Sequence, residues 1–100
     1  MKPAATIPIG FMVMQLGQIS VSRKAATELD EFQAGNALMR HMIGDWGDID
    51  GDTWRVNDDA LDNGRRVVSS YLDRKFGRFL IVTEANRSAT TIVLPEELGL

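Results

Sequence analysis

Residues 67–94, VVSSYLDRKFGRFLIVTEANRSATTIVL, decide the fold class of this chain. Apolar and polar side chains alternate through the stretch, as they do in strands that bury one face. Turn residues divide it into three strands, which we place at 67–72, 78–84 and 89–94. Strands with such short connections form an antiparallel meander, and Pro95 ends the last one. This part of the chain is therefore predicted as one sheet.

The segment before the sheet predicts two short helices. Ser20 or Ser22 can cap a helix over 23–32 that Gly35 ends, and Asn36 can cap a second helix over 37–43. The first helix spaces its apolar residues at i, i+3 and i+4, as in a helix that buries one stripe. These residues are Ala25, Ala26, Leu29 and Phe32.

A third helix is predicted after the turn GDWGD at 44–48. Asp50 or Asp52 can cap this helix, and Gly64 ends it. The acidic first turn suits the positive end of the helix dipole. The helices together are expected to cover one face of the sheet.

The amino-terminal segment reads as a strand over 11–19, preceded by a loose lead-in at 1–8. A chain of 100 residues fits one hydrophobic core and leaves no room for two. We therefore predict a single α+β domain over 1–100. In it, an antiparallel β-meander of three to four strands packs against two to three short helices.

Composition narrows the class of protein. Cysteine is absent, which excludes disulfides, thiolate metal sites and a cysteine nucleophile. The absence also suits a reducing compartment. No apolar run approaches the roughly 18–20 residues that span a bilayer. We expect a cytoplasmic protein without membrane contact.

Charge is distributed unevenly along the chain, although the net charge is only −3. The segment 45–62 holds seven of the fourteen acidic residues, with Arg55 as its only cation. The acidic residues are Asp45, Asp48, Asp50, Asp52, Asp58, Asp59 and Asp62. The segment after it is basic, with Arg65, Arg66, Arg74, Lys75, Arg78 and Arg87. Such asymmetry concerns partners rather than fold.

The run DIDGD at 48–52 only superficially matches a calcium loop. Such a loop needs glycine at position 6 and a bidentate glutamate at position 12. Here those positions hold Thr53 and Asp59. Helix capping explains the same aspartates, so we expect no bound metal.

Catalytic signatures are also missing. His41 is the only histidine, which excludes a histidine pair for zinc. No serine on a strained turn lies beside a base, and no lysine follows the glycines as a phosphate-binding loop requires. We place His41 on a helix surface or in a partly buried core, and predict a protein that is not an enzyme and has no cofactor.

The two tryptophans, Trp46 and Trp54, are interpreted as core anchors rather than stacking platforms. A buried tryptophan usually finds an acceptor for its ring N–H, and Asp45 or Asp48 could supply it to Trp46.

The two charged segments each allow two interpretations. The acidic segment is either a solvated, capped helix or a surface that imitates phosphates for a cationic groove. The basic segment could contact nucleic acid, with the aromatics Tyr71, Phe76 and Phe79 interleaved. Alternation along strands, however, would divide its cations between two faces, and a pI near 5.0 disfavours strong phosphate binding.

The sequence also resembles a known group, in motifs spread over about residues 7–98. The motifs are RH at 40–41, GDWGD at 44–48, Trp54, ND at 57–58, AL at 60–61, GRRVVSSY at 64–71, IVTEANRSATT at 81–91 and LP at 94–95. They are similar to those of short proteins carried by plasmids, prophages and integrative elements of proteobacteria. The chain departs from this group at Asn86, where an acidic residue is expected, and at the more basic 74–77.

Small acidic proteins from such elements also resemble anti-CRISPR proteins that act on type I systems. This resemblance implies stoichiometric binding to CRISPR-associated subunits of a crRNA-guided complex in the host bacterial cytoplasm. Entry of target DNA would be blocked, without direct nucleic-acid or small-molecule binding. The expected contacts are Asp45, Asp48, Asp50, Asp52, Asp58, Asp59 and Asp62, with Arg74, Lys75 and Arg78 as a second patch.

Two other interaction modes stay open at this point. The chain could be an accessory or regulatory protein of a mobile element that binds nucleic acid through its basic hairpin. A hydrophobic patch of Phe11, Met12 and Met14 could also form the interface.

Overall fold

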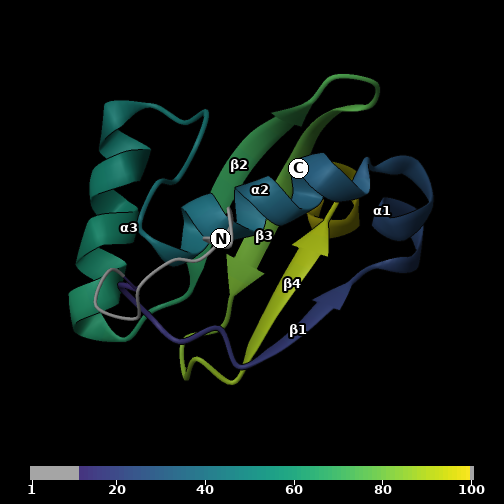
Figure 1. Ribbon diagram of the computed structural model, residues 1–100. Helices are drawn as coiled ribbons and strands as arrows, with labels where there is room; N and C mark the ends of the chain where they lie inside the picture. Colours follow the sequence, from purple (N-terminus) through teal and green to yellow (C-terminus); the bar gives the residue numbers. More distant parts are fainter. Residues whose placement is uncertain (1–11, 100) are drawn as a thin grey trace, which may run out of the picture.

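The computed structural model describes residues 12–99 (Figure 1). The fold class is α+β, as predicted. Its elements are β1 (Gln18–Val21), α1 (Arg23–Glu28), α2 (Glu31–Met42), α3 (Gly51–Asn63), β2 (Val67–Asp73), β3 (Gly77–Thr83), β4 (Ala89–Val93) and a final 3₁₀ turn, η2 (Pro95–Leu98).

The sheet has the strand order β1-β4-β3-β2. Strands β2, β3 and β4 form the predicted antiparallel meander. Strand β1 joins β4 in parallel, because the helices carry the chain across the sheet before the meander begins. The sheet is therefore mixed rather than wholly antiparallel.

The first strand begins later than predicted. Only 18–21 is extended and paired, whereas residues 12–17 are irregular and Phe11 lies outside the described residues. Gly17 has φ +63°, and a Cβ there would lie 2.3 Å from the backbone of Ser88. This close approach requires glycine and delays the start of the strand.

The break between the first two helices also lies elsewhere than predicted. Asp30, not Asn36, caps the second helix, and its carboxylate accepts the backbone N–H groups of Phe32 and Gln33. The backbone N–H of Asp30 donates to the carboxylate of Asp73, the last residue of β2, at 3.0 Å. A contact distant in sequence thus fixes the break, and Gly35 is tolerated inside α2.

Helix α2 crosses one face of the sheet and covers the main core (Figure 1). The buried residues of this cluster are Ala25, Ala37, Tyr71, Phe79, Ile81, Ile92 and Leu94. The predicted stripe of the first helix is only partly right: Ala25 is buried and Leu29 half-buried, whereas Ala26 is exposed and Phe32 is 85% exposed. With the helix broken at Asp30, Phe32 lies in the first turn of α2 and faces solvent.

A second cluster packs α3 against the end of the sheet. It contains Met14, Leu16, Trp46, Ala60 and Val67, with Trp54 partly buried beside them. Trp46 is therefore a core anchor, as predicted, and Trp54 packs against the same cluster while partly exposed. On the opposite face of the sheet, a smaller cluster lies under η2.

His41 is wholly buried, whereas we expected it on a surface or partly buried. The Thr90 hydroxyl donates to the Leu16 carbonyl at 2.8 Å, so its oxygen accepts from Thr83 at 2.7 Å. Thr83 then accepts from Nε2–H of His41 at 2.7 Å. Nδ1 remains to accept the Ser69 hydroxyl at 2.6 Å. Because burial disfavours the charged ring, the imidazole is neutral and Nδ1 accepts this hydrogen bond.

The stability of the fold should therefore depend on pH through His41. Burial, with a smaller effect of the Arg87 charge, lowers the pKa of His41 from its ordinary 6.5 to about 4. The unfolded chain takes up this proton first, so the stabilisation is complete above about pH 6.5 and is lost as pH falls toward 4. The loss is on the order of 3 kcal/mol.

Because His41 is the only histidine, its imidazole NMR signals can be followed without ambiguity. We expect a titration midpoint well below 6.5 in the folded protein, and a lower free energy of unfolding in urea at pH 4.5 than at pH 7. A midpoint near 6.5 in the folded state would contradict this assignment.

Candidate functional site

The acidic segment comprises the loop at 45–50 and helix α3, and a capping residue ends the helix on each side. The Asp50 carboxylate accepts the Thr53 backbone N–H at 2.7 Å, so Asp50 rather than Asp52 is the cap. Gly64 ends the helix with φ +64°, as predicted. The capping bonds hold the Asp50 pKa below its usual value.

An asparagine attaches α3 to the edge of the sheet. The Asn57 side chain donates to the Val68 carbonyl at 2.7 Å and accepts the Val68 N–H at 3.2 Å. The amide thus satisfies the edge of β2 as a neighbouring strand would. This contact, together with the Trp46 cluster, sets the position of the helix.

The GDWGD loop continues along the same edge. Ser70 donates its N–H to the Trp46 carbonyl at 3.1 Å and accepts the Asp48 N–H at 2.7 Å. Gly47 has φ +82°, and a Cβ there would lie 2.1 Å from the Ser70 carbonyl oxygen. The Tyr71 hydroxyl donates to the Asp45 carbonyl at 2.6 Å. Position 47 therefore requires glycine, because the loop packs directly against the backbone of β2.

Four of the seven predicted aspartates are engaged within the molecule. Besides Asp50, Asp45 accepts from Arg40 at 2.8 Å, and this hydrogen bond is the main cause of its lowered pKa. Asp52 pairs with Arg55 on the surface. Asp58 accepts the ring N–H of Trp46 at 3.0 Å, so the predicted acceptors, Asp45 and Asp48, are wrong.

The other three aspartates are Asp48, Asp59 and Asp62. They are exposed and make no side-chain hydrogen bond or ion pair within 12–99. Asp52, Asp59 and Asp62 follow one outer stripe of α3, spanning about 15 Å at 1.5 Å per residue. We call this stripe, together with Asp48, the acidic face.

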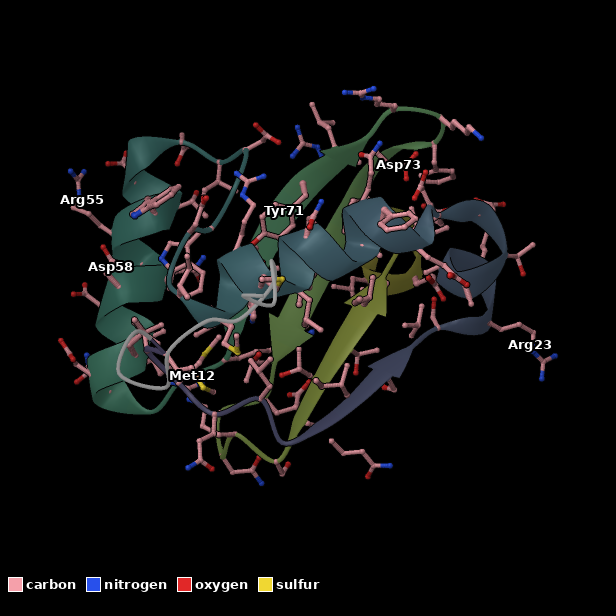
Figure 2. All side chains as sticks on the ribbon, in the orientation of Figure 1. Met12, Arg23, Arg55, Asp58, Tyr71 and Asp73 are labelled. Atoms are coloured by element: carbon pink, nitrogen blue, oxygen red, sulfur yellow. The ribbon has the colours of Figure 1, made fainter. Side chains whose placement is uncertain are left out.

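The stripe of the acidic face lies on the side of α3 opposite Asn57, away from the sheet, whereas Asp48 lies in the loop that pairs with Ser70 of β2. Figure 2 shows Arg55 on that side of α3, projecting into solvent. Arg55 pairs with Asp52 across one turn, which partly neutralises that end of the stripe. The strongest negative charge therefore lies around Asp59 and Asp62.

The predicted basic patch is divided. Arg74 and Lys75 are exposed in the β2–β3 turn, whereas the Arg78 guanidinium donates to the Asp48 carbonyl at 3.0 Å and to the Ser70 hydroxyl. Arg78 thus braces the GDWGD loop.

Arg87 lies in the turn between β3 and β4, and its side chain donates to backbone carbonyls. It has φ +60° and donates to the carbonyls of Ala60 at 2.9 Å and Arg65 at 2.6 Å. The guanidinium therefore closes the carboxy-terminal end of α3.

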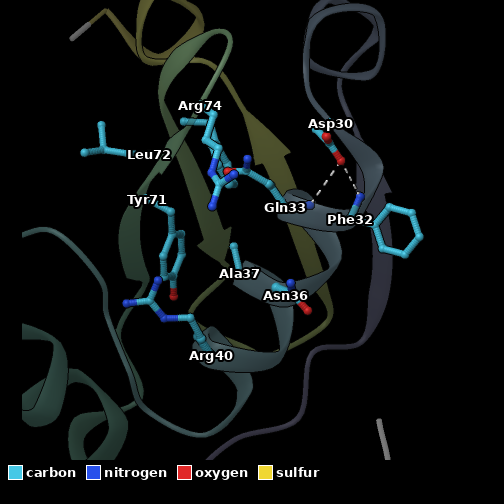
Figure 3. Close-up of a pocket in the computed structure, with 10 residues that line it drawn as sticks. Asp30, Phe32, Gln33, Asn36, Ala37, Arg40, Tyr71, Leu72 and Arg74 are labelled. Atoms are coloured by element: carbon cyan, nitrogen blue, oxygen red, sulfur yellow. Dashed lines mark hydrogen bonds between the residues drawn. The ribbon is translucent and has the colours of Figure 1, made fainter. Parts of the chain in front are cut away.

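A shallow groove of about 550 Å³ lies between α2 and β2 (Figure 3). Tyr71 lies between Arg74 and Arg40. The Arg40 guanidinium lies 4.9 Å from the centroid of the Tyr71 ring. Phe32 points outward at the start of α2. The sequence did not indicate this groove, because the helix break was misplaced and Arg40 had no apparent partner.

The alternative hydrophobic patch is not a single exposed surface. Met14 is 8% exposed and packs in the Trp46 cluster, and Phe11 lies outside the described residues. Met12 is half-buried and lines a second groove with Ile19 and Met42.

Comparison with protein-family models, with curated proteins and with solved structures gave no match. None of the helices within 12–99 has the length and hydrophobicity needed to cross a membrane. In the same part of the chain, no three His, Asp or Glu side chains lie together as metal ligands would.

Asp58 and Asp59 are adjacent but should differ in their effect on stability. Asp58→Ala leaves the buried Trp46 N–H without its acceptor, which should cost about 1–2 kcal/mol. Asp59→Ala changes only a solvated side chain and should stay within about 0.5 kcal/mol of the parent. Urea unfolding monitored by tryptophan fluorescence measures both. Equal destabilisation would contradict the assignment of Asp58 as a structural residue.

Proposed function

We propose that this protein is a non-enzymatic inhibitor that binds a bacterial type I CRISPR surveillance complex and blocks target DNA. The observation that carries the proposal is the acidic face: Asp48, Asp59 and Asp62 remain exposed without internal partners, while neighbouring aspartates hold the backbone in place. The sequence resemblance supplies the class of partner.

The chemistry of the face supports competition with nucleic acid. RNA-guided complexes hold DNA in positively charged channels. Carboxylates accept charge-assisted hydrogen bonds from arginine, as phosphate oxygens do. A helix fixed by Asn57 and by the Trp46–Asp58 bond presents these carboxylates without further ordering, which reduces the entropic cost of binding.

The contacts of the predicted residues separate them into two roles. Asp48, Asp52, Asp59 and Asp62 are proposed to meet the cationic partner. Asp45, Asp50, Asp58 and Arg78 instead fix the loop and the helix through internal hydrogen bonds. Arg74 and Lys75 form the proposed second contact, at the tip of the β2–β3 hairpin.

The alternative, nucleic-acid binding through the basic hairpin, has less support. Arg74 and Lys75 lie at one end of β2, and Arg65 and Arg66 precede its other end. Six residue steps along the strand separate these ends by about 20 Å. Arg78 and Arg87 are engaged with backbone carbonyls. The cations therefore do not form one continuous surface.

Reversal of charge on the acidic face tests the proposal. The double variant Asp59→Lys/Asp62→Lys should weaken binding to a purified type I surveillance complex at least 10-fold, because two attractive contacts become repulsive. Fluorescence anisotropy with labelled target DNA measures the protein concentration that blocks DNA binding.

The matched control is Glu28→Lys/Glu31→Lys, which changes net charge equally at exposed positions in α1 and at the start of α2, away from the acidic face. It should inhibit nearly as well as the parent. Equal loss in both variants would indicate a net-charge effect, and full inhibition by the test variant would refute the acidic-face mechanism. A salt-steep gel shift of DNA by the isolated protein would instead favour the alternative.

A further inference from the structure

We propose that two copies of this protein associate through the open edge of β1, pairing their β1 strands antiparallel into one continuous sheet. The inference rests on the strand edges, and so it is independent of the acidic face. The two edges of the sheet differ sharply in how the chain covers them.

The β2 edge is closed along most of its length. Val68 is paired by the Asn57 side chain, and Ser70 by the backbone of Trp46 and Asp48. Of the β2 residues whose backbone N–H and C=O groups point away from β3, only Leu72, near the hairpin turn, has no hydrogen-bond partner for them within 12–99. This edge is protected against further strand addition.

No segment among residues 12–99 pairs with the outer edge of β1. The N–H of Gln18 donates to Ser88 and the N–H of Ser22 to Ile92, so the even-numbered residues face β4. Ile19 and Val21 therefore direct their N–H and C=O groups away from the sheet. Figure 1 shows β1 at the outer edge, with no described segment beside it. The two side chains are 48% and 44% exposed.

The strand is complementary to itself in one register. A two-fold axis at Ser20 places Ile19 opposite Val21 of the second copy, and these residues exchange both backbone hydrogen bonds. The two symmetry-related pairs bring β-branched side chains together on one face, which is a stabilising cross-strand arrangement. The Ser20 residues of the two copies then lie directly opposite each other as a non-hydrogen-bonded pair.

The charge pattern favours a second copy over another partner. Residues 12–22 contain no charged side chain, so two such edges meet without repulsion. Proteins usually protect edge strands with lysine or proline, and β1 has neither. The acidic helix α3 lies at the other end of the molecule from β1, which keeps the two acidic faces apart (Figure 1).

The Ile19 side chain also lines the second groove, together with Met12, Val13 and Met42. The contact can therefore extend beyond the strand itself. Four-residue strands alone bury less than the roughly 1,200 Å² of a stable interface, so we expect a weak pair, with Kd on the order of 10 µM or weaker.

Sedimentation velocity on the full chain from about 5 to 500 µM tests the pairing. The parent should shift from monomer toward dimer as the concentration rises. Ile19→Lys should remain monomeric, because each copy would place a lysine opposite Val21 of the other copy. Leu72→Lys, at an exposed apolar residue of the other edge, is the control and should behave as the parent. A parent that is monomeric throughout, or a dimer that Ile19→Lys leaves intact, would overturn the proposal.

A cross-link tests the register itself. The chain has no cysteine, so Ser20→Cys introduces a unique thiol. In the proposed pair the two Cα atoms are about 4.5 Å apart, within the range for a disulfide. Mild oxidation should give a covalent dimer. Gln18→Cys places its thiols about 13 Å apart along the strands and should not cross-link. Equal cross-linking of both variants would refute this register.

Discussion

The imidazole of His41 joins helix α2 to β2, β3 and β4 through consecutive hydrogen bonds that end at the Leu16 carbonyl. Every member is buried, so each polar atom depends on its neighbour in the chain. The ring also packs edge-on against Trp46, with 5.5 Å between centroids. Trp46 in turn bonds to Asp58 on α3. The position of the acidic helix therefore depends on a neutral histidine inside the core.

The acidic segment combines two uses of the same side chain. A carboxylate beside backbone N–H groups or a tryptophan ring stabilises the local fold, as at Asp50 and Asp58. A carboxylate on the outer stripe, as at Asp59 and Asp62, adds charge without an internal partner in the described structure. The first kind makes the surface rigid and the second kind makes it negative. Capping and phosphate imitation are thus compatible in one helix, at different residues.

Local chemistry made much of this fold predictable from sequence. Period-two alternation gave the three-stranded meander, because the side-chain faces of a strand are set by its backbone. Asp50 and Gly64 marked the ends of α3, since cap residues act within a few positions of themselves. The acidic residues of the candidate site were also evident. Gly35 misled the prediction of α2, because an exposed glycine can lie inside a helix that packing stabilises.

The sequence by itself determined the α+β class, the order of most elements and the presence of an acidic helix. Only the tertiary structure decided where α2 begins, which aspartates stay exposed, and that β1 runs parallel to β4 at the edge of the sheet. These features depend on contacts between residues far apart in the chain, such as Asp30 with Asp73 and Trp46 with Asp58. Propensity and spacing describe neighbours in sequence, and they carry no information about which distant group completes a hydrogen bond.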